Sequence, residues 1–382
     1  MIQTFFLFYS LLIISYFFAL YCIILIKPRR KFKDYNKPFS VIIPCYNEES
    51  RYLLDCVNSI IKAEGNKQII LVNNNSNKEE TLNAINEIKR NKNVLVLNEK
   101  RQGKRFAHSK GLKYAKHELV VFVDSDTIVL KESFLELIKP FQDKSIGGVC
   151  GNIKIANVKD NFFVKCLDSM YWNSFESHRK STSNLGFLYV CSGALSCYRK
   201  DSLLKLEDKY LNQTFMGRPC SISDDAFMTV RVQSQLGKKI YFQSKAIGLT
   251  YSPNKFKGFW KQLERWRRGF LRESLLMWKE PKKNIKLLFL DSQFNFFTQT
   301  IMAFFKIALL INLIIFFSLG NLASFFLWFI LIASLHSVYL FVYSPKRIPN
   351  ILAYSFLYEF IFIFTYFHAL INIRNQGSWS TR

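Results

Sequence analysis

Apolar residues are distributed unevenly along the 382 residues of the chain, and the longest apolar runs lie near its two ends. Met1 to Ile26 carry no charged side chain, which is enough apolar helix to cross a hydrocarbon core of ~30 Å. Two further runs, at about 294–318 and 322–343, are separated only by the short segment SLGN. We therefore predict one amino-terminal membrane span and an antiparallel membrane hairpin near the carboxyl end.

A last apolar stretch, Ile351 to Ile373, has two interpretations. It is long enough to span a membrane, but it contains Glu359 and His368. An apolar helix with such residues can instead lie in the membrane interface. Hydropathy alone leaves both arrangements open.

Between these ends the chain alternates between short strands and amphipathic helices. Buried strands are predicted for FSVIIP from Phe39, QIILVN at 68–73, NVLVLN at 93–98 and LVVFVD at 119–124. ESRYLLDCVNSIIKAE, between the first two strands, repeats its apolar residues at helical spacing, and further helices are expected at about 79–90 and 104–116. This repetition predicts an α/β domain with a mostly parallel sheet, whose ligands gather at the carboxyl ends of the strands.

The charge pattern orients this domain. The chain has a formal net charge of +25, and the basic segment KPRRKFK begins directly after Ile26. Basic flanks stay on the cytoplasmic side, so we expect the amino terminus outside and residues 27 to about 290 in the cytosol, next to anionic membrane lipids. The basic residues are spread through the domain without a recognition module, which argues against a nucleic-acid partner. The eight cysteines form no C-x-x-C pair, which argues against structural zinc and fits reduced thiols in the cytosol.

Two carboxylates stand at a strand end in the segment VFVDSDT. Asp124 and Asp126 leave the sheet at its ligand-binding edge, and hard oxygen ligands suit Mg²⁺ or Mn²⁺. A divalent ion there can bridge the oxygens of a diphosphate. A lone D-x-D is also common in ordinary surface turns, so this motif needs support from others.

Two other segments carry groups with suitable chemistry. In ISDDAF, a carboxylate of Asp224 or Asp225 can act as a general base toward an acceptor hydroxyl, although such a sequence can also simply cap a helix. In QLERW, Arg265 can clamp a diphosphate, and Gln262 lies one helical turn from Trp266. The Trp266 ring can stack on a sugar, or it can sit at a membrane interface.

The motifs PCYNEES, VNNNS, GKRFAHSKGL, VDSDT, VCSGALSCYRK, SDD and QLERW, in this order, resemble those of the family-2 inverting glycosyltransferases over about 39–270. Within that family the chain looks most like the hyaluronan synthase, chitin synthase and nodulation chitooligosaccharide synthase group. RRGFLRES follows the Q-x-x-R-W motif, and the closing NQGSWSTR is similar to that group's W-G-T-R. The resemblance implies a GT-A-like nucleotide-sugar-binding domain.

The resemblance also implies roles for individual residues. Asp225 would be the catalytic base with Asp224 beside it, and Asp124 and Asp126 would hold nucleotide and metal. The remaining roles would be nucleotide binding by Tyr46, Asn47, Asn74 and Lys104, diphosphate binding by Gln262, Arg265 and Arg382, acceptor binding by Cys191, Ser192, Gly193 and Trp266, and a cap over the nucleotide site from Trp379 and Thr381.

Four departures from the family pattern limit what the resemblance implies. VNNNS has Asn73 and Asn74 where the family usually has an Asp, although an amide can still bind uracil. SDDA replaces the G-D-D-R of hyaluronan synthases, which argues against hyaluronan as the product. W-S-T-R replaces W-G-T-R and restricts the backbone. Finally, the chain stops at Arg382 where relatives often continue, which predicts a reduced or homo-oligomeric channel.

These patterns predict a multi-pass protein of the cell membrane with a cytosolic catalytic domain. The expected segments are 1–26 (span), 27–38 (basic linker), 39–250 (glycosyltransferase domain), 251–290 (QxxRW segment and interfacial helices), 291–343 (hairpin) and 344–382 (apolar segment with the WSTR tail). Because a catalytic tail must be cytosolic, 351–373 is then interfacial or re-entrant.

The expected function is inverting transfer of a sugar from a UDP-sugar to a growing carbohydrate acceptor, processive and coupled to membrane passage. Two alternatives stay open from the sequence. One is a transferase that adds a single sugar to a lipid-linked or short glycan acceptor. The other is a catalytically silent scaffold of polysaccharide export that retains the fold.

Overall fold

A computed structural model of the chain describes residues 2–26, 30–315, 320 and 343–377. Most of the second helix of the predicted hairpin, at about 322–343, lies outside the described residues. Trp379, Thr381 and Arg382 also lie outside them.

The centre of the domain is an eight-stranded sheet with the strand order β3-β2-β1-β4-β7-β6-β10-β5. β7 is antiparallel to β4 and β6, and β5 is antiparallel to β10, whereas the other neighbours pair in parallel. The strands are β1 (Phe39–Cys45), β2 (Lys67–Asn73), β3 (Val94–Asn98), β4 (Leu119–Val123), β5 (Thr127–Val129), β6 (Ile146–Ile155), β7 (Leu195–Arg199) and β10 (Lys239–Thr250). The predicted mostly parallel sheet and the positions of the four predicted strands are confirmed. The prediction that all four are buried was wrong for β3, which lies at the edge of the sheet and buries only Val94.

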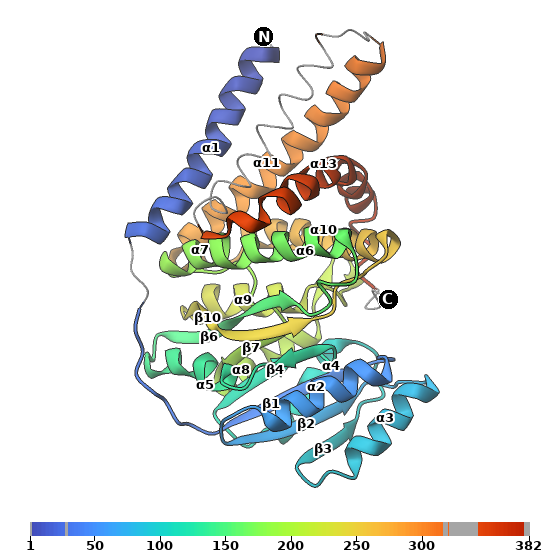
Figure 1. Cartoon of the computed structure of the whole chain (residues 1–382). Helices are drawn as coiled ribbons and strands as arrows, with labels where there is room; N and C mark the ends of the chain where they lie inside the picture. The colour runs from blue at the N-terminus through green and yellow to red at the C-terminus, as the bar shows by residue number, and fades with distance from the viewer. Residues whose placement is uncertain (1, 27–29, 316–319, 321–342, 378–382) are drawn as a thin grey trace.

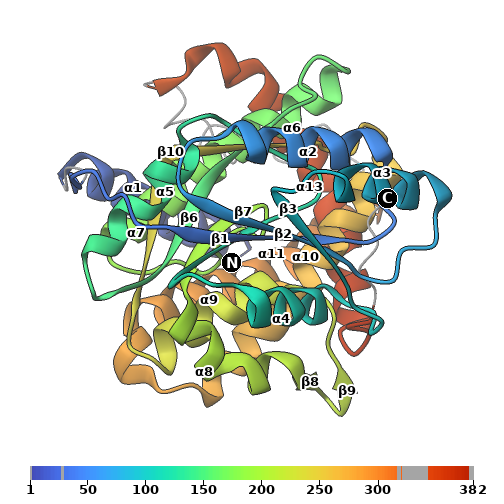
Figure 2. The ribbon, with the colours of Figure 1, turned by 90° about the horizontal axis from the view of Figure 1, so that it is seen from below.

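Helices cover both faces of the sheet, as expected for strand–helix repetition (Figure 2). α2 (Ser50–Lys62) and α3 (Glu79–Lys89) lie on one face, and α4 (Lys104–Tyr114) lies on the other together with α8 (Lys200–Leu211) and α9 (Asp224–Ser234). α2 buries Leu53, Cys56, Val57 and Ile60, which is the apolar stripe that its spacing predicts.

The core of the domain is built where these helices meet the strands. Every residue of β1 and of β4 is buried, because both strands lie inside the sheet with helices on each face. Short helices complete this region: α5 (Ser133–Ile138) and a 3₁₀ turn, η1 (Lys139–Gln142). A small hairpin, β8 (Thr214–Phe215) with β9 (Arg218–Pro219), lies between α8 and α9 in the chain.

A layer of helices packs on the far end of the sheet (Figure 1). α6 (Phe162–Asn173), the π-helical turn η2 (Ser174–Arg179) and α7 (Lys180–Asn184) form one continuous segment, and α10 (Phe256–Leu276) continues into η3 (Met277–Lys279). α13 (Ile348–Ile371), which follows the 3₁₀ turn η4 (Pro345–Arg347), rests on α6 and α10. Leu167, Phe259 and Tyr354, one from each helix, share an apolar cluster.

α1 (Ile2–Ile26) and α11 (Lys282–Ile315) extend away from the sheet (Figure 1). The Tyr16 hydroxyl donates a hydrogen bond of 2.7 Å to Asp291 and accepts one of 3.1 Å from Asn295, and these contacts tie α1 to α11. Within the residues that the structure describes, no helix combines the length and the apolar character that crossing a membrane requires. The membrane segments therefore stay predictions of the sequence.

Candidate active site

A cavity of about 490 Å³ opens at the carboxyl ends of β1 and β4. Segments that are far apart in the chain meet there: the loops after β1 and β4, the start of α4, the start of α9 and the middle of α10. The predicted site residues that line it are Tyr46, Asn47, Lys104, Asp124, Asp126, Ser192, Gly193, Asp224, Asp225, Gln262, Arg265 and Trp266. The structure thus brings together most of the residues that the motifs singled out.

Asn47 and Asn74 hold the walls of this cavity in place. Asn47, at φ 50°, accepts hydrogen bonds from the backbone N–H groups of Asn77 and Lys78 at 2.8 and 3.1 Å. Asn74 does not line the cavity: its amide donates to the Arg101 carbonyl at 2.6 Å and accepts from the Gly103 N–H at 2.8 Å. Their expected contacts with a base stay predictions, whereas their contacts with neighbouring loops are defined.

The Asn74 contact also explains how Lys104 is placed. Gly103 has φ +130°, a conformation that side chains rarely adopt, and it directly precedes the first residue of α4. The hydrogen bond from Gly103 to Asn74 holds the start of α4 in place. Lys104, the first residue of this helix, therefore lies close to Asp124 at the end of β4.

Lys104 and Asp124 form an ion pair on the cavity wall. Burial disfavours the charged form of Lys104, but Asp124, Asp225 and Asp224 outweigh this effect and raise the pKa of the ammonium. A Cβ added to Gly193 would lie 2.8 Å from Lys104 Nζ, so the backbone of the CSG motif passes directly over this ion pair. Cys191 itself is fully buried, and its N–H donates to Thr229 Oγ1 at 2.9 Å.

Asp124 and Asp126 have the chemistry of a partial metal site. Mg²⁺ at nucleotide sites typically takes one or two protein carboxylates and completes its shell with phosphate oxygens and water. Among the described residues, no three His, Cys, Asp or Glu side chains converge to form a complete metal cage. Two carboxylates on the wall of one cavity therefore fit Mg²⁺ or Mn²⁺ held jointly with a diphosphate.

The adjacent carboxylates of the SDD segment have different environments. Asp224 is buried and accepts a hydrogen bond of 3.1 Å from Gln213, and burial raises its pKa against the opposing charges of Arg105 and Arg272. Asp225 is only partly buried, and its Oδ1 accepts a hydrogen bond of 2.9 Å from the Ala226 N–H. Ser223 is the N-cap residue of α9 but makes no side-chain capping hydrogen bond, and Asp224 and Asp225 belong to the first turn of the helix. This turn holds the Asp225 carboxylate on the cavity wall.

The QLERW segment lies on α10 and forms the opposite wall. Arg265 Nε and Gln262 Oε1 are buried and have no hydrogen-bond partner within the described part of the chain. Burial lowers the pKa of Arg265, while Asp225 and Asp124 act in the opposite direction. The Trp266 ring lies 6.1 Å from that of Tyr171, between ring centroids, which gives the wall an aromatic patch. A buried guanidinium whose Nε–H donor has no partner within the described residues is suited to bind an anionic ligand.

Comparison with known proteins agrees with this geometry. Residues 40–206 match the family described as "Glycosyl transferase family 2". The chain is 30% identical over 360 residues to a hyaluronan synthase of Streptococcus pyogenes, which covers 92% of this chain and 85% of the relative. It is 30% identical over 241 residues to an N-acetylglucosaminyltransferase of Mesorhizobium japonicum, covering 62% of this chain and 56% of that one. The chain belongs to glycosyltransferase family 2.

The fold has a counterpart among solved structures. The mannosyltransferase PcManGT from Pyrobaculum calidifontis, in complex with GDP-Man and Mn²⁺, superposes with a TM-score of 0.64 at 16% identity. The match covers 94% of this chain and 96% of the other. The predicted GT-A-like α/β fold is confirmed by this likeness, and the family membership shows that the protein is a glycosyltransferase.

The loop that precedes Asp224 and Asp225 is in close contact with α10. Ser223, at φ 55°, sits on Gly269: a Cβ added to Gly269 would lie 1.6 Å from Ser223 Oγ and 2.6 Å from Ser223 Cβ. The fully buried Arg272 donates to the Ser223 carbonyl at 3.4 Å. The glycine of RRGF is therefore a contact surface for the residue that directly precedes Asp224 and Asp225.

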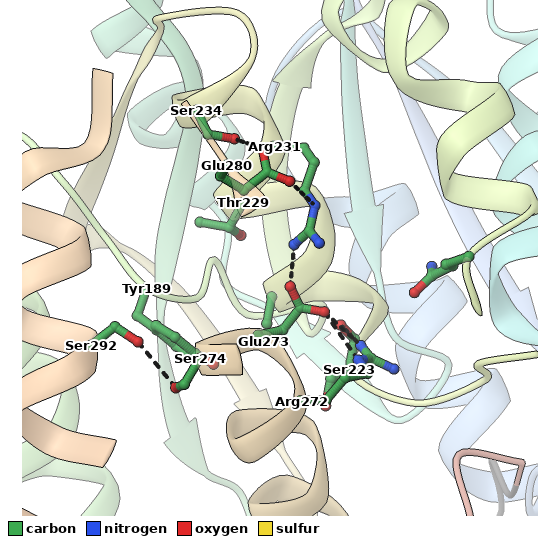
Figure 3. A network of polar contacts seen from close by, with 12 residues as sticks. Tyr189, Ser223, Thr229, Arg231, Ser234, Arg272, Glu273, Ser274, Glu280 and Ser292 are labelled. Atoms are coloured by element: carbon green, nitrogen blue, oxygen red, sulfur yellow. Dashed lines mark hydrogen bonds and ion pairs between the residues drawn. The ribbon is translucent and has the colours of Figure 1, made fainter. Parts of the chain in front are cut away.

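A buried ionic network holds α9 and α10 together behind this loop (Figure 3). Glu273 pairs with both Arg231 and Arg272, and Glu280 pairs with Arg231 at 3.3 Å. Ser234 donates to Glu280 at 2.6 Å. Breaking one partner of such a network leaves a buried charge uncompensated, so the network fixes the relative placement of the two helices.

The carboxyl-terminal segment reaches the same loop. The Ser221 N–H donates to the Gln376 carbonyl at 2.7 Å, and Arg272 donates to the Gln376 side chain at 3.2 Å. Arg268 donates to the Asn375 carbonyl. The chain just before the WSTR motif is thus attached to a segment that lines the cavity.

Several residues of the site were not predicted from the sequence. Tyr171 reaches the cavity from α6, where burial together with Asp126 raises its pKa, and no pattern had marked this helix. His108 lies one helical turn after Lys104, a spacing that places it on the same helix face. Gly269 also carried a signal, because an isolated glycine inside a helical pattern often marks a close contact.

Proposed function

We propose that this glycosyltransferase inverts the anomeric centre of a UDP-sugar and adds the sugar to a growing polysaccharide or oligosaccharide. The observation that carries the proposal is the single cavity lined by Asp124, Asp126, Lys104, Arg265 and Asp225. It combines two carboxylates for a metal, two cations for a diphosphate and one carboxylate for an acceptor hydroxyl. The five residues come from four segments of the chain: the loop after β4, the start of α4, the start of α9 and the middle of α10.

In the proposed reaction, Asp225 removes the proton from an acceptor hydroxyl, which attacks the anomeric carbon as the bond to the diphosphate breaks. No covalent enzyme intermediate is needed. Arg265 and Lys104 stabilise the negative charge on the departing UDP. A divalent cation held by Asp124 and Asp126 would supply further charge neutralisation when bound. The PcManGT structure, solved with GDP-Man and Mn²⁺, supports a metal and nucleotide of this kind.

We further propose that the acceptor lies along the wall formed by Trp266 and Tyr171, with Ser192 and Gly193 at its border. Aromatic faces suit sugar rings because they offer a flat apolar surface to the C–H groups of the sugar. This wall belongs to α6 and α10, the helices on which α13 rests. A polymer that leaves the cavity on this side meets the helical layer directly.

Apolar side chains on the surface of α11 and α13 support a membrane location for the enzyme. We propose a multi-pass protein of the cell membrane with a cytosolic catalytic domain, in contact with membrane lipids, in which α13 lies in the interface. Exposed apolar side chains on α11 and α13, including Leu287, Phe297, Leu352 and Phe364, support contact with lipid. We propose that synthesis is processive and that the product passes through the membrane, with a homo-oligomer completing the channel.

Product length tests the proposed processivity. Purified full-length protein given a radiolabelled UDP-sugar, a divalent cation and a short glycan primer should produce long polymer while most primer is still unextended. The Asp225→Asn variant serves as the negative control. Products that carry one added sugar at every time point would contradict processivity and support the single-addition alternative.

A further inference from the structure

His108 is a buried side chain on the cavity wall that the proposed reaction does not use. It lies on α4 four positions after Lys104, so both side chains project from the same helix face. Its exposed fraction is 7%, and it lines the cavity together with Lys104 and Asp224. A histidine at this place is therefore within the site without any role assigned so far.

Neighbouring side chains hold the imidazole ring in one orientation. Its Nδ1 lies 2.8 Å from the hydroxyl of Tyr210, and its ring centroid lies 4.1 Å from that of Phe122. Tyr210 stacks nearly parallel to the imidazole, at an interplanar angle of 11°. A ring fixed on two sides offers its remaining nitrogen in a defined direction.

The protonation pattern follows from the same contacts. Burial lowers the pKa of His108 well below its usual value, with Lys104 acting in the same direction, so the ring is neutral. Burial raises the pKa of Tyr210 well above its usual value, so its hydroxyl keeps its proton. We assign the ring hydrogen of the neutral imidazole to Nε2, the tautomer in which the Tyr210 hydroxyl donates to Nδ1.

This Nε2 has no hydrogen-bond partner among the residues that the structure describes. A buried N–H that lacks an acceptor is unfavourable, so Nε2 of a histidine that lines the cavity is suited to a hydrogen bond with a bound ligand. Gln213, which donates to Asp224, likewise has a buried Oε1 without a partner in the described chain. Gln213 itself does not line the cavity, so His108 is the cavity-lining residue of these two.

We propose that His108 Nε2 donates a hydrogen bond to a hydroxyl or acetamido oxygen of the donor sugar and thereby helps to select that sugar. This inference rests on the proposed function. A neutral donor suits an uncharged sugar oxygen, whereas Lys104 and Arg265 already supply positive charge for the diphosphate. His108 lines the same cavity as Asp224 and as Asp225, the proposed base toward the acceptor hydroxyl that attacks the anomeric carbon.

Two amide substitutions separate the two ring nitrogens. In His108→Asn the amide can replace Nδ1 toward Tyr210 but cannot reach the position of Nε2. In His108→Gln the amide can replace Nε2. We expect His108→Asn to raise the KM for the preferred UDP-sugar about fivefold to tenfold, as the loss of one hydrogen bond implies. His108→Gln keeps a hydrogen-bond donor at the position of Nε2, so its KM should be lower than that of His108→Asn. The affinity for UDP alone, measured by competition, should stay within about twofold in both variants.

The comparison with UDP distinguishes sugar recognition from a structural role. A His108→Asn enzyme with wild-type KM would overturn the inference, as would a loss of UDP affinity that matches the rise in KM. A His108→Gln enzyme that is worse than His108→Asn would also overturn it, since the contact with Tyr210 would then be the one that matters. A wild-type enzyme that consumes no UDP-sugar would instead overturn the proposed function, and this inference with it.

Discussion

Replacing Asp225 with Asn is expected to lower turnover by at least ~10²-fold, because the amide cannot accept the proton of the acceptor hydroxyl. The substitution is nearly isosteric, and the amide oxygen can still accept the hydrogen bond from the Ala226 N–H. Binding of UDP should therefore be retained while kcat falls. Initial rates of UDP release at saturating donor, together with UDP affinity, provide the measurement.

Asp201 offers a matched control for this prediction. It lies in the first turn of α8, is exposed and is not part of the cavity lining. Like Asp225, it accepts a hydrogen bond from the backbone N–H of the next residue, here from Ser202 at 2.7 Å. Asp201→Asn should leave kcat close to that of the wild type. Equal activity of the two variants would remove Asp225 from the role of base.

The second large effect is expected at a residue that touches no substrate. Gly269→Ala places a methyl group 1.6 Å from Ser223 Oγ and 2.6 Å from Ser223 Cβ, so the loop before Asp224 and Asp225 must move away from α10. A displacement of about 1 Å in a catalytic group can lower the rate by ~10²-fold. We expect kcat to fall by about this factor while the protein still folds. Circular dichroism and UDP affinity monitor folding.

A second substitution tests whether the clash is the cause. Ser223→Gly removes both clashing atoms, after which the nearest Ser223 atom is Cα at 3.9 Å, and glycine tolerates the left-handed conformation of this position. The double variant Gly269→Ala with Ser223→Gly should recover most of the lost activity. If Gly269→Ala alone keeps wild-type kcat, the contact between Ser223 and α10 does not position the catalytic loop.

Much of the fold could be predicted because its signals are local. The four predicted strands are short apolar runs in the parallel part of the sheet, three of them inside it and β3 at its edge. The three predicted helices show amphipathic spacing or follow a glycine. Asp124 and Asp126 could be placed because the end of β4 fixes where they leave the sheet. The antiparallel strands β7 and β5 were not predicted, since strand direction depends on pairing between distant segments.

Contacts between distant segments account for what the sequence did not reveal about the site. The hydrogen bond that Asn74 accepts from the Gly103 N–H spans 29 positions, and no local pattern indicates it. The expected contact of Asn74 with a base stays a prediction. The attachment of Gln376 to Ser221 likewise depends on how α13 packs. His108 and Tyr171 belong to helices whose register against the cavity cannot be read from spacing alone. The sequence therefore identified the chemical groups better than the contacts that position them.

The central claim is that this cavity binds and cleaves a UDP-sugar with the help of a divalent cation. The most direct test is UDP release by the purified full-length protein from UDP-GlcNAc, UDP-GlcA, UDP-Glc and UDP-Gal, with Mn²⁺ or Mg²⁺ and with a chelator. We predict that at least one of these donors is consumed and that the chelator reduces the rate of UDP release to background. Asp126→Asn should also reduce this rate to background, at every cation concentration in the assay. Consumption of none of the four donors, or full activity without a divalent cation, would contradict this claim.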